Sequence, residues 1–302
     1  MKLLLTLLTA LAAAASPTAH AASDAPREAA HFHHVHLNVT DATRTRDFYK
    51  KFFGATEVAY RGRSPALFSE KSFLLTNTVK APPASNDGTS LWHIGWSGVD
   101  GASEYAWRVA DGIHVHTPLT TPRLPGVDPR AAYMYFRGPD GELVEVSTVN
   151  RNHRFEHVHL LASDIEATTD WFYQHLGLAA SQPKAIAFHG VLLNVVQADN
   201  VSLVVFARPR PDRDNPFAAA ALWPEAGFSP TDGRAVDHIA FSYRDITPVL
   251  QRMQAAGVAI VKDIAVDPRL GHKSFFVRGP DQLLVEIVED RPIPEGVWMA
   301  SQ

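Results

Sequence analysis

Histidine and glutamate residues with the chemistry of metal ligands recur in the same pattern in the two halves of the chain. Each half has one His at the start of each of two predicted strands and a Glu in its last strand. Two imidazoles and one carboxylate that project from neighbouring strands can occupy one face of a divalent metal and leave other positions open. We therefore predict one metal centre per half, with the ligand sets His34, His93, Glu145 and His157, His238, Glu286.

Two further histidines lie close to these predicted ligands. His36 and His159 follow His34 and His157 by two residues, so they point to the same face of their strands. They either orient the ligands or act as bases, or they only fill a half-polar position, and the sequence leaves these readings open. Other candidates for a general base in predicted strands are His114, His116, His189 and His272.

The elements that must position these side chains are repeated along the chain. The segment HVHLNVTDATRTRDFYKKFFG from His34 reappears as HVHLLASDIEATTDWFYQHLG from His157. A second segment, which starts at Trp92, corresponds to one that starts at Asp237, and RGPDGELVEV corresponds to RGPDQLLVEI. Each copy reads as a βαβββ unit that occurs twice. We therefore predict an α+β fold with two domains, residues 31–150 and 153–290, separated by the polar stretch 150–154.

Four helices follow from capping residues and helical spacing. Asp41 is a good N-cap, and Gly54 lies where a left-handed C-terminal residue belongs; Asp164 and Gly177 repeat this design. Residues 100–112 and 245–257 read as the other two helices. The Pro-rich stretch 208–234 has no counterpart in the first copy, and it is either a lid over a pocket or a packed surface loop.

Composition and charge narrow the class of ligand. The chain has 302 residues, 46% of them hydrophobic, which is enough for two ordinary cores. A formal net charge of -4 leaves no basic excess of the kind that nucleic acids or anionic membranes attract. We therefore expect a small-molecule substrate, with no nucleic acid and no membrane as partner, and a monomer or weak dimer.

The N-terminal residues predict export. Lys2 precedes an apolar run from Leu3 to Ala15, and Ala19-His20-Ala21 is an A-x-A cleavage site, so residues 1–21 read as a signal peptide. The mature protein is then periplasmic or secreted. The sequence contains no cysteine, so any metal must be held by His, carboxylate or water.

Two motifs carry a resemblance to a known family. H-x-x-L or H-x-x-F opens the half-repeats, as at His34 and His238, and R-G-P-D-x-x-x-V-E closes each copy. In these features the chain resembles the vicinal oxygen chelate superfamily of glyoxalases, fosfomycin resistance proteins and extradiol dioxygenases, over about residues 31–290. The resemblance implies an open eight-stranded cup in each domain, and it assigns the ligand role to the same six residues.

A finer resemblance concerns the signature of the extradiol dioxygenases, in which a His and then a Tyr precede the ligand Glu. The second copy has His272, but Phe276 occupies the Tyr position. The first copy has Tyr135, ten residues before Glu145, but lacks the upstream His. We therefore take Tyr135 and His272 as candidate catalytic residues, although the position of Tyr135 in a strand slightly favours a packed aromatic.

Three functions fit these residues. The first is an extradiol-type dioxygenase with Fe(II) held by the triad, although export weakens this assignment because zinc and copper compete well for such sites. The second is a glyoxalase-like lyase or isomerase with Zn, Mn or Ni. The third is a binding protein of the antibiotic-sequestering kind, which would bind its ligand without turnover.

Overall fold

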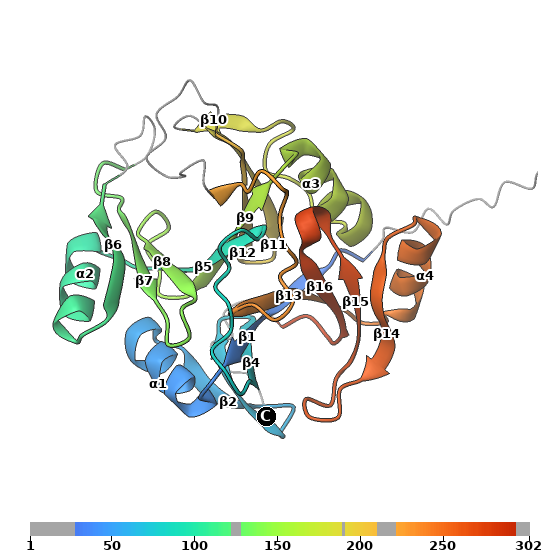
Figure 1. The fold of residues 1–302 in the computed structure, drawn as a ribbon, viewed down its shortest axis with the longest axis horizontal. Helices are drawn as coiled ribbons and strands as arrows, with labels where there is room; N and C mark the ends of the chain where they lie inside the picture. The colour runs from blue at the N-terminus through green and yellow to red at the C-terminus, as the bar shows by residue number, and fades with distance from the viewer. Residues whose placement is uncertain (1–27, 122–127, 189–190, 210–221, 294–302) are drawn as a thin grey trace, which may run out of the picture.

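A computed structural model describes residues 28–121, 128–188, 191–209 and 222–293 (Figure 1). The predicted signal peptide and part of the Pro-rich stretch 208–234 lie outside these residues, as does His189. Within the described part of the chain, no helix is both long and apolar enough to cross a membrane.

The first half of the chain contains two modules, each with one helix and four strands. The first consists of β1 (His31–Val39), α1 (Ala42–Phe53), β2 (Thr56–Tyr60), β3 (Ser64–Ser69) and β4 (Ser72–Thr78). The second consists of β5 (Leu91–Ser97), α2 (Gly101–Ala110), β6 (His114–Thr120), β7 (Tyr133–Arg137) and β8 (Leu143–Ser147).

The second half repeats this order. The third module consists of β9 (Phe155–Ala162), α3 (Ile165–Trp171), the π-helical turn η1 (Phe172–Leu176), β10 (Ile186–Phe188), β11 (Val191–Ala198) and β12 (Val201–Ala207). The fourth consists of β13 (Val236–Tyr243), α4 (Thr247–Ala255), β14 (Ile260–Val266), β15 (Lys273–Arg278), the 3₁₀ turn η3 (Pro280–Gln282) and β16 (Leu284–Glu289).

The expected capping residues are confirmed. The Asp41 side chain accepts hydrogen bonds from the backbone N–H groups of Thr43 and Arg44, and Gly54 ends α1 with φ 65°. Asp164 caps α3 in the same way, and Gly177 adopts φ 73° after η1. The sequence therefore defines the same strand–helix unit in both halves.

The four modules form two open eight-stranded sheets, as predicted, but the pairing of the modules differs from the prediction. One sheet has the order β14-β15-β16-β13-β1-β4-β3-β2, which joins the first module to the fourth. The other has the order β10-β11-β12-β9-β5-β8-β7-β6, which joins the second module to the third. The expectation that residues 31–150 and 153–290 each close their own cup is therefore wrong.

The registers at the centre of each sheet explain this pairing. The first strand, β1, runs antiparallel to β13, with His36 opposite His238, and β9 runs antiparallel to β5, with His159 opposite His93. Figure 1 shows blue β1 and orange β13 side by side near the middle of the molecule. The boundary at residues 150–154 therefore lies within one sheet, between β8 and β9.

The main core and the ligand-bearing faces lie on opposite sides of the sheets. On β1, Val35, Leu37 and Val39 point into the main core, which also includes buried residues of the helices, such as Phe53 and Leu250. Strand alternation sends His34 and His36 to the other face. That face carries a separate apolar cluster in each sheet, around Phe73 in the first and around Trp92 in the second.

Candidate metal centres

The structure gathers buried His and Glu side chains into two clusters. The β1–β13 site contains His34, His36, His238 and Glu286, and the β5–β9 site contains His93, Glu145, His157 and His159. In each cluster, one potential ligand atom per residue lies within 4.8 Å of all the others. All six predicted ligands belong to these two clusters. Whether they bind a metal remains a prediction.

The predicted grouping of the ligands is wrong in one respect. We predicted that His34 lies with His93 and Glu145, and His157 with His238 and Glu286. In the structure, His34 lies with His238 and Glu286, while His157 lies with His93 and Glu145. The reason is the module pairing, since β1 joins the sheet of the fourth module and β9 joins that of the second.

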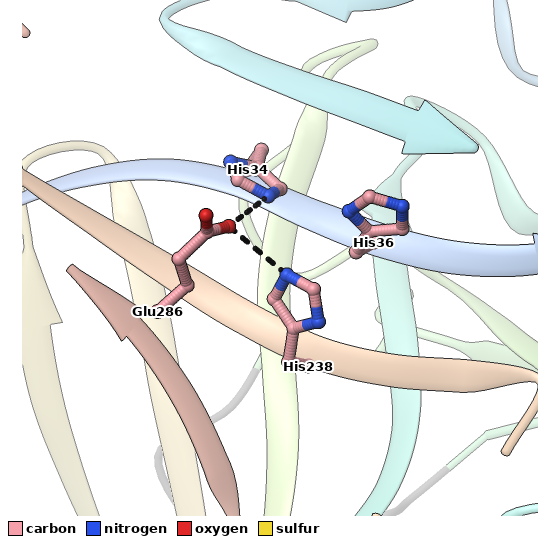
Figure 2. Close-up of side chains that lie close together, drawn as sticks. All are labelled: His34, His36, His238 and Glu286. Atoms are coloured by element: carbon pink, nitrogen blue, oxygen red, sulfur yellow. Dashed lines mark hydrogen bonds and ion pairs between the residues drawn. The ribbon is translucent and has the colours of Figure 1, made fainter. Parts of the chain in front are cut away.

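In the β1–β13 site, two imidazoles approach one carboxylate oxygen. Figure 2 shows Glu286 facing His34 and His238, with His36 beside them. Glu286 Oε2 lies 3.1 Å from Nε2 of His34 and 3.1 Å from Nε2 of His238. The His34 contact does not have the orientation of a hydrogen bond, because His34 Nε2 has no hydrogen-bond partner.

Bulges in the paired strands place the neighbours of these ligands. The β1–β13 register shifts between Phe32 and His34, so His33 and His34 are consecutive residues whose rings meet, with 2.7 Å between their Nδ1 atoms. The register shifts again opposite Asp237, which precedes His238. Bulges of this kind re-aim side chains and are common beside functional sites.

A chain of hydrogen bonds determines the tautomer of His34. His33 Nε2 lies 3.3 Å from Asp290 Oδ2, and a carboxylate can only accept, so His33 donates there. If His33 carries only that one proton, its Nδ1 accepts from the Nδ1–H of His34. His34 Nε2 is left with a lone pair, and it faces another acceptor, Glu286 Oε2. A bound cation can be coordinated by two acceptor atoms that face each other in a buried site in this way.

The other two ligands of this site are also held by polar partners. His238 donates from Nδ1 to Asp237 Oδ1 over 2.6 Å. His272 donates from Nε2 to Glu286 Oε1 over 3.0 Å, and its Nδ1 accepts from the Tyr60 hydroxyl, also over 3.0 Å. Such outer hydrogen bonds orient metal ligands and tune their basicity.

The pKa values in the β1–β13 site show one carboxylate shared among several imidazoles. Burial lowers the pKa of His34 well below its usual value and lowers that of His36 to about 3. Burial also opposes protonation of His238, but hydrogen bonds with Asp237 and Glu286 outweigh it and raise that pKa to about 9. Burial would raise the pKa of Glu286, yet the hydrogen bonds from His238 and His272 hold it well below its usual value.

The β5–β9 site repeats the central geometry. Glu145 Oε2 lies 2.8 Å from His93 Nε2 and 3.2 Å from His157 Nε2. Gly95 makes room for this arrangement, because a Cβ at that position would lie 2.1 Å from Cε1 of His157. Burial opposes protonation of His157, but the Glu145 carboxylate outweighs it and raises the His157 pKa to about 10. Burial prevails at His93 and lowers its pKa to about 4.

The surroundings of the β5–β9 site are aromatic where those of the other site are polar. Trp92 occupies the bulged position that corresponds to Asp237, and its ring lies 4.5 Å from that of His93. The site shares its face of the sheet with a cluster of Trp92, Tyr133, Tyr135, Leu143, Leu161, Val191, Phe206 and Trp223. His159 packs against Phe206 at 4.2 Å, and neither of its buried ring nitrogens has a hydrogen-bond partner.

The two candidate catalytic residues lie in different sites. Tyr135 faces Glu145 across β7 and β8, and its ring lies 5.0 Å from that of His93. Burial raises the pKa of Tyr135 well above its usual value, and the Glu145 carboxylate adds to this effect. His272 contacts Glu286 instead, and Phe276 is the residue opposite Glu286. The two halves of the extradiol signature are therefore not brought together.

Other candidates are less close to the clusters. His116 approaches Tyr135 with 6.4 Å between ring centroids, while His114 is exposed. Of the Pro-rich stretch 208–234, the described part includes Trp223, which is buried and donates from its indole N–H to the Ala162 carbonyl over 3.1 Å. This residue packs on the aromatic cluster of the β5–β9 site, so this part of the stretch is a packed cover.

Sequence reasoning missed four residues that support the ligands, namely His33, Tyr60, Asp237 and Asp290. Strict strand alternation would turn His33 away from His34. Only a bulge brings the two together, and its one visible trace is the dense run HFHHVH from His31. The other three are ordinary in type and distant in sequence from the residues they support.

The donor sets of both clusters fit a divalent cation. Both consist of buried imidazoles and one carboxylate, which suit Zn, Fe, Mn or Ni. Unpartnered buried nitrogens, His34 Nε2 and His36 Nδ1 in one cluster and His93 Nδ1 and both nitrogens of His159 in the other, provide lone pairs or N–H groups that the protein does not satisfy. The identity of the metal does not follow from this geometry.

Comparisons with known proteins agree with this architecture. Among curated proteins, no sequence matches this chain. Among solved structures, glyoxalase I from Zea mays superposes with a TM-score of 0.64 at 15% identity, over 86% of this chain and 92% of that one. A candidate dioxygenase from Bacillus subtilis gives 0.56 at 15% identity, over 87% and 86%. At this level of identity, the likeness shows the fold alone.

The sequence profile of one family accounts for most of the chain. It matches twice, over residues 31–146 and 154–287, which together include every member of the two clusters. The chain thus belongs to the Glyoxalase/Bleomycin resistance protein/Dioxygenase superfamily.

Proposed function

We infer that the protein is a metal-dependent dioxygenase of the extradiol type, and that its reaction centre is the β5–β9 site. The observation that carries this inference is the combination of a His, His, Glu set with an aromatic wall, a tyrosine and an unpartnered histidine. An aromatic diol needs all of these: two vicinal oxygens for the cation, ring surfaces for packing, and groups that move protons.

The cation would be held by His93, Glu145 and His157. This set leaves open positions, and a bound Fe(II) would supply binding of the two diol oxygens and of O₂. In the overall reaction, the ring bond beside the two hydroxyl-bearing carbons breaks and both atoms of O₂ enter the product. No external reductant is needed, so the protein has only to position the diol and handle its protons.

His159 and Tyr135 are suited to the proton transfers. Burial, with a smaller contribution from His93, lowers the pKa of His159 well below its usual value, so the imidazole is neutral and can accept a proton from the diol. Tyr135 has a raised pKa and stays protonated, so its hydroxyl can donate. Both side chains approach His93, with ring centroids 4.7 Å and 5.0 Å away.

The aromatic wall accounts for the substrate class. The ring centroid of Trp92 lies 5.0 Å from that of His159 and 5.8 Å from that of Tyr135. An aromatic ring therefore lies beside both groups that would transfer protons. Aromatic rings favour stacked or edge-on contacts with another ring. A monocyclic diol would therefore bind with its ring against this wall and its oxygens towards Glu145 and the two ligand imidazoles.

A second candidate function is a glyoxalase-like lyase or isomerase at the same site. The observation that favours it is His159 itself, since abstraction of one acidic C–H proton needs a cation to polarise a carbonyl and a single neutral base. In that reaction Tyr135 has no necessary role. The contribution of Tyr135 to turnover thus separates the two candidates.

The proposal also includes export of the protein. The predicted signal peptide over residues 1–21 would send the protein to the periplasm or outside the cell, where it acquires its metal and acts on a small molecule as a monomer or weak dimer.

The test is oxygen consumption by the mature protein loaded with Fe(II), with catechol as the probe. We expect catechol-dependent uptake of O₂ that is lost in Glu145→Gln. Isomerisation of a 2-oxoaldehyde without O₂ uptake would replace the dioxygenase with the lyase or isomerase. Stoichiometric binding of catechol without turnover would contradict both and support a binding protein.

A further inference from the structure

We propose that the β1–β13 site is a structural metal clasp, in which a bound cation fastens the first module of the chain to the last. Its ligands are His34 from β1, His238 from β13 and Glu286 from β16, with His36 as a fourth donor. This role concerns stability, so it stands independently of the reaction proposed for the β5–β9 site.

The ligands of this site come from the two ends of the described chain. His34 and Glu286 are 252 positions apart in the sequence, whereas His93 and His157 in the other site are 64 positions apart. Closing a loop removes more conformational entropy from the unfolded chain when the loop is longer. A cation at the β1–β13 site therefore constrains the unfolded chain more than one at the β5–β9 site.

The polar contacts around the β1–β13 ligands also cross between these two modules. Tyr60 of the first module bonds His272 of the fourth, and His33 contacts Asp290. Asn38 donates to Asp237 Oδ2 over 2.8 Å.

Asp290 receives a further contact from the first module. Arg61 Nη2 lies 3.1 Å from Asp290 Oδ2, so Asp290 joins His33 and Arg61. Contacts of this kind bridge the first and fourth modules and hold them together.

The burial of the ligands suits a closed site. His34 is 0% exposed, Glu286 is 2% exposed and His238 is 4% exposed. Structural metal sites keep four protein ligands, whereas catalytic ones leave a position for water or substrate. His36, whose Nδ1 has no partner, supplies the fourth ligand here. Phe276 stands where the other site has Tyr135, so the proton donor of the proposed reaction is missing.

The clasp predicts that metal stabilises the protein through one site more than through the other. The experiment removes metal from the mature chain with a chelator, adds Zn²⁺ alone and measures the thermal unfolding midpoint. In the wild-type protein we expect Zn²⁺ to raise the midpoint by about 5 °C or more. The matched variants are Glu286→Gln and Glu145→Gln, which change one ligand in each site without altering its size.

The expected result is that Glu145→Gln keeps most of the increase and Glu286→Gln loses it. Equal losses, or a larger loss in Glu145→Gln, would overturn the proposal. A second measurement leaves the ligands of the clasp unchanged. In the Glu145→Gln protein, Zn²⁺ should slow hydrogen exchange of the backbone amides in β1, β13 and β16. Unchanged exchange in those strands would overturn the proposal even if Glu286→Gln failed to fold.

Discussion

The two sites have the same central geometry and opposite surroundings. In both, a Glu oxygen lies close to two imidazole nitrogens that come from antiparallel strands at the centre of a sheet. Asp237 precedes His238 in one site, and Trp92 precedes His93 in the other. Both residues lie at corresponding bulges of their sheets. The backbone thus determines where the ligands meet, and the two sites differ in the residues that surround those ligands.

This difference has a direct physical meaning. A carboxylate such as Asp237 fixes the ring of His238 and increases its basicity, which favours tight metal binding. The Trp92 ring provides no such bond but offers a flat apolar surface beside His93. The polar site is therefore suited to holding a cation, and the aromatic site to holding an organic molecule next to one.

The largest expected effect is on turnover after loss of a ligand in the aromatic site. His93→Ala should reduce kcat/KM for catechol-dependent O₂ uptake by more than about 100-fold, because loss of a direct ligand costs at least as much as loss of its support. His238→Ala, compared at a temperature where both variants are folded, should lower it far less. The reverse order would place the reaction in the polar site.

Tyr135→Phe tests the proton donor next. We expect kcat to fall by about 10²-fold or more, the usual contribution of a positioned acid or base, while metal content stays the same. Phe276→Tyr places the same hydroxyl in the other site and serves as the control, with no gain in turnover. Full activity in Tyr135→Phe would remove the dioxygenase assignment and favour the lyase or isomerase.

Exchange of the outer residues tests the comparison itself. Asp237→Asn should weaken Zn²⁺ binding at the β1–β13 site by about 10-fold, because the amide is a poorer acceptor for the His238 N–H. Trp92→Asp should strengthen metal binding at the β5–β9 site while it weakens catechol binding. Titration calorimetry with Zn²⁺ and with catechol measures both, and an unchanged Zn²⁺ affinity in both variants would show that the outer residues do not set it.

The smallest expected effect is a pH dependence of the metal-free protein. Its His157 and His238 have pKa values raised to about 10 and about 9, above the unfolded value of about 6.5. Their contribution to stability is therefore complete below about pH 6.5, and it is lost as pH rises through the folded pKa values.

Urea unfolding between pH 6.5 and pH 10, with chelator and with Zn²⁺, measures this loss. The free energy of unfolding should fall with pH only in the metal-free protein, since a bound cation replaces those protons. A parallel fall in the Zn²⁺-loaded protein would mean that other groups cause it.

Much of this arrangement could be predicted from the repeat. The two copies indicated the βαβββ modules, the caps Asp41 and Asp164, and six residues that the structure gathers into the two clusters. The sequence could not predict which modules share a sheet, because His34 would meet one His and one Glu in either arrangement, and long-range packing decides between them. Nor could it predict that His33 turns towards His34, since a bulge breaks the alternation on which strand patterns depend.

The most direct test of the account is the metal content of variants at His34, whose grouping the structure changes, and at the Glu of each site. The account predicts that His34→Ala and Glu286→Ala each remove the metal of the β1–β13 site and that the double variant removes no more, while His34→Ala combined with Glu145→Ala removes the metal of both sites. Elemental analysis per chain distinguishes these results. If instead His34→Ala and Glu145→Ala remove the same metal, and Glu286→Ala removes a different one, each half of the chain builds its own site and the account is wrong.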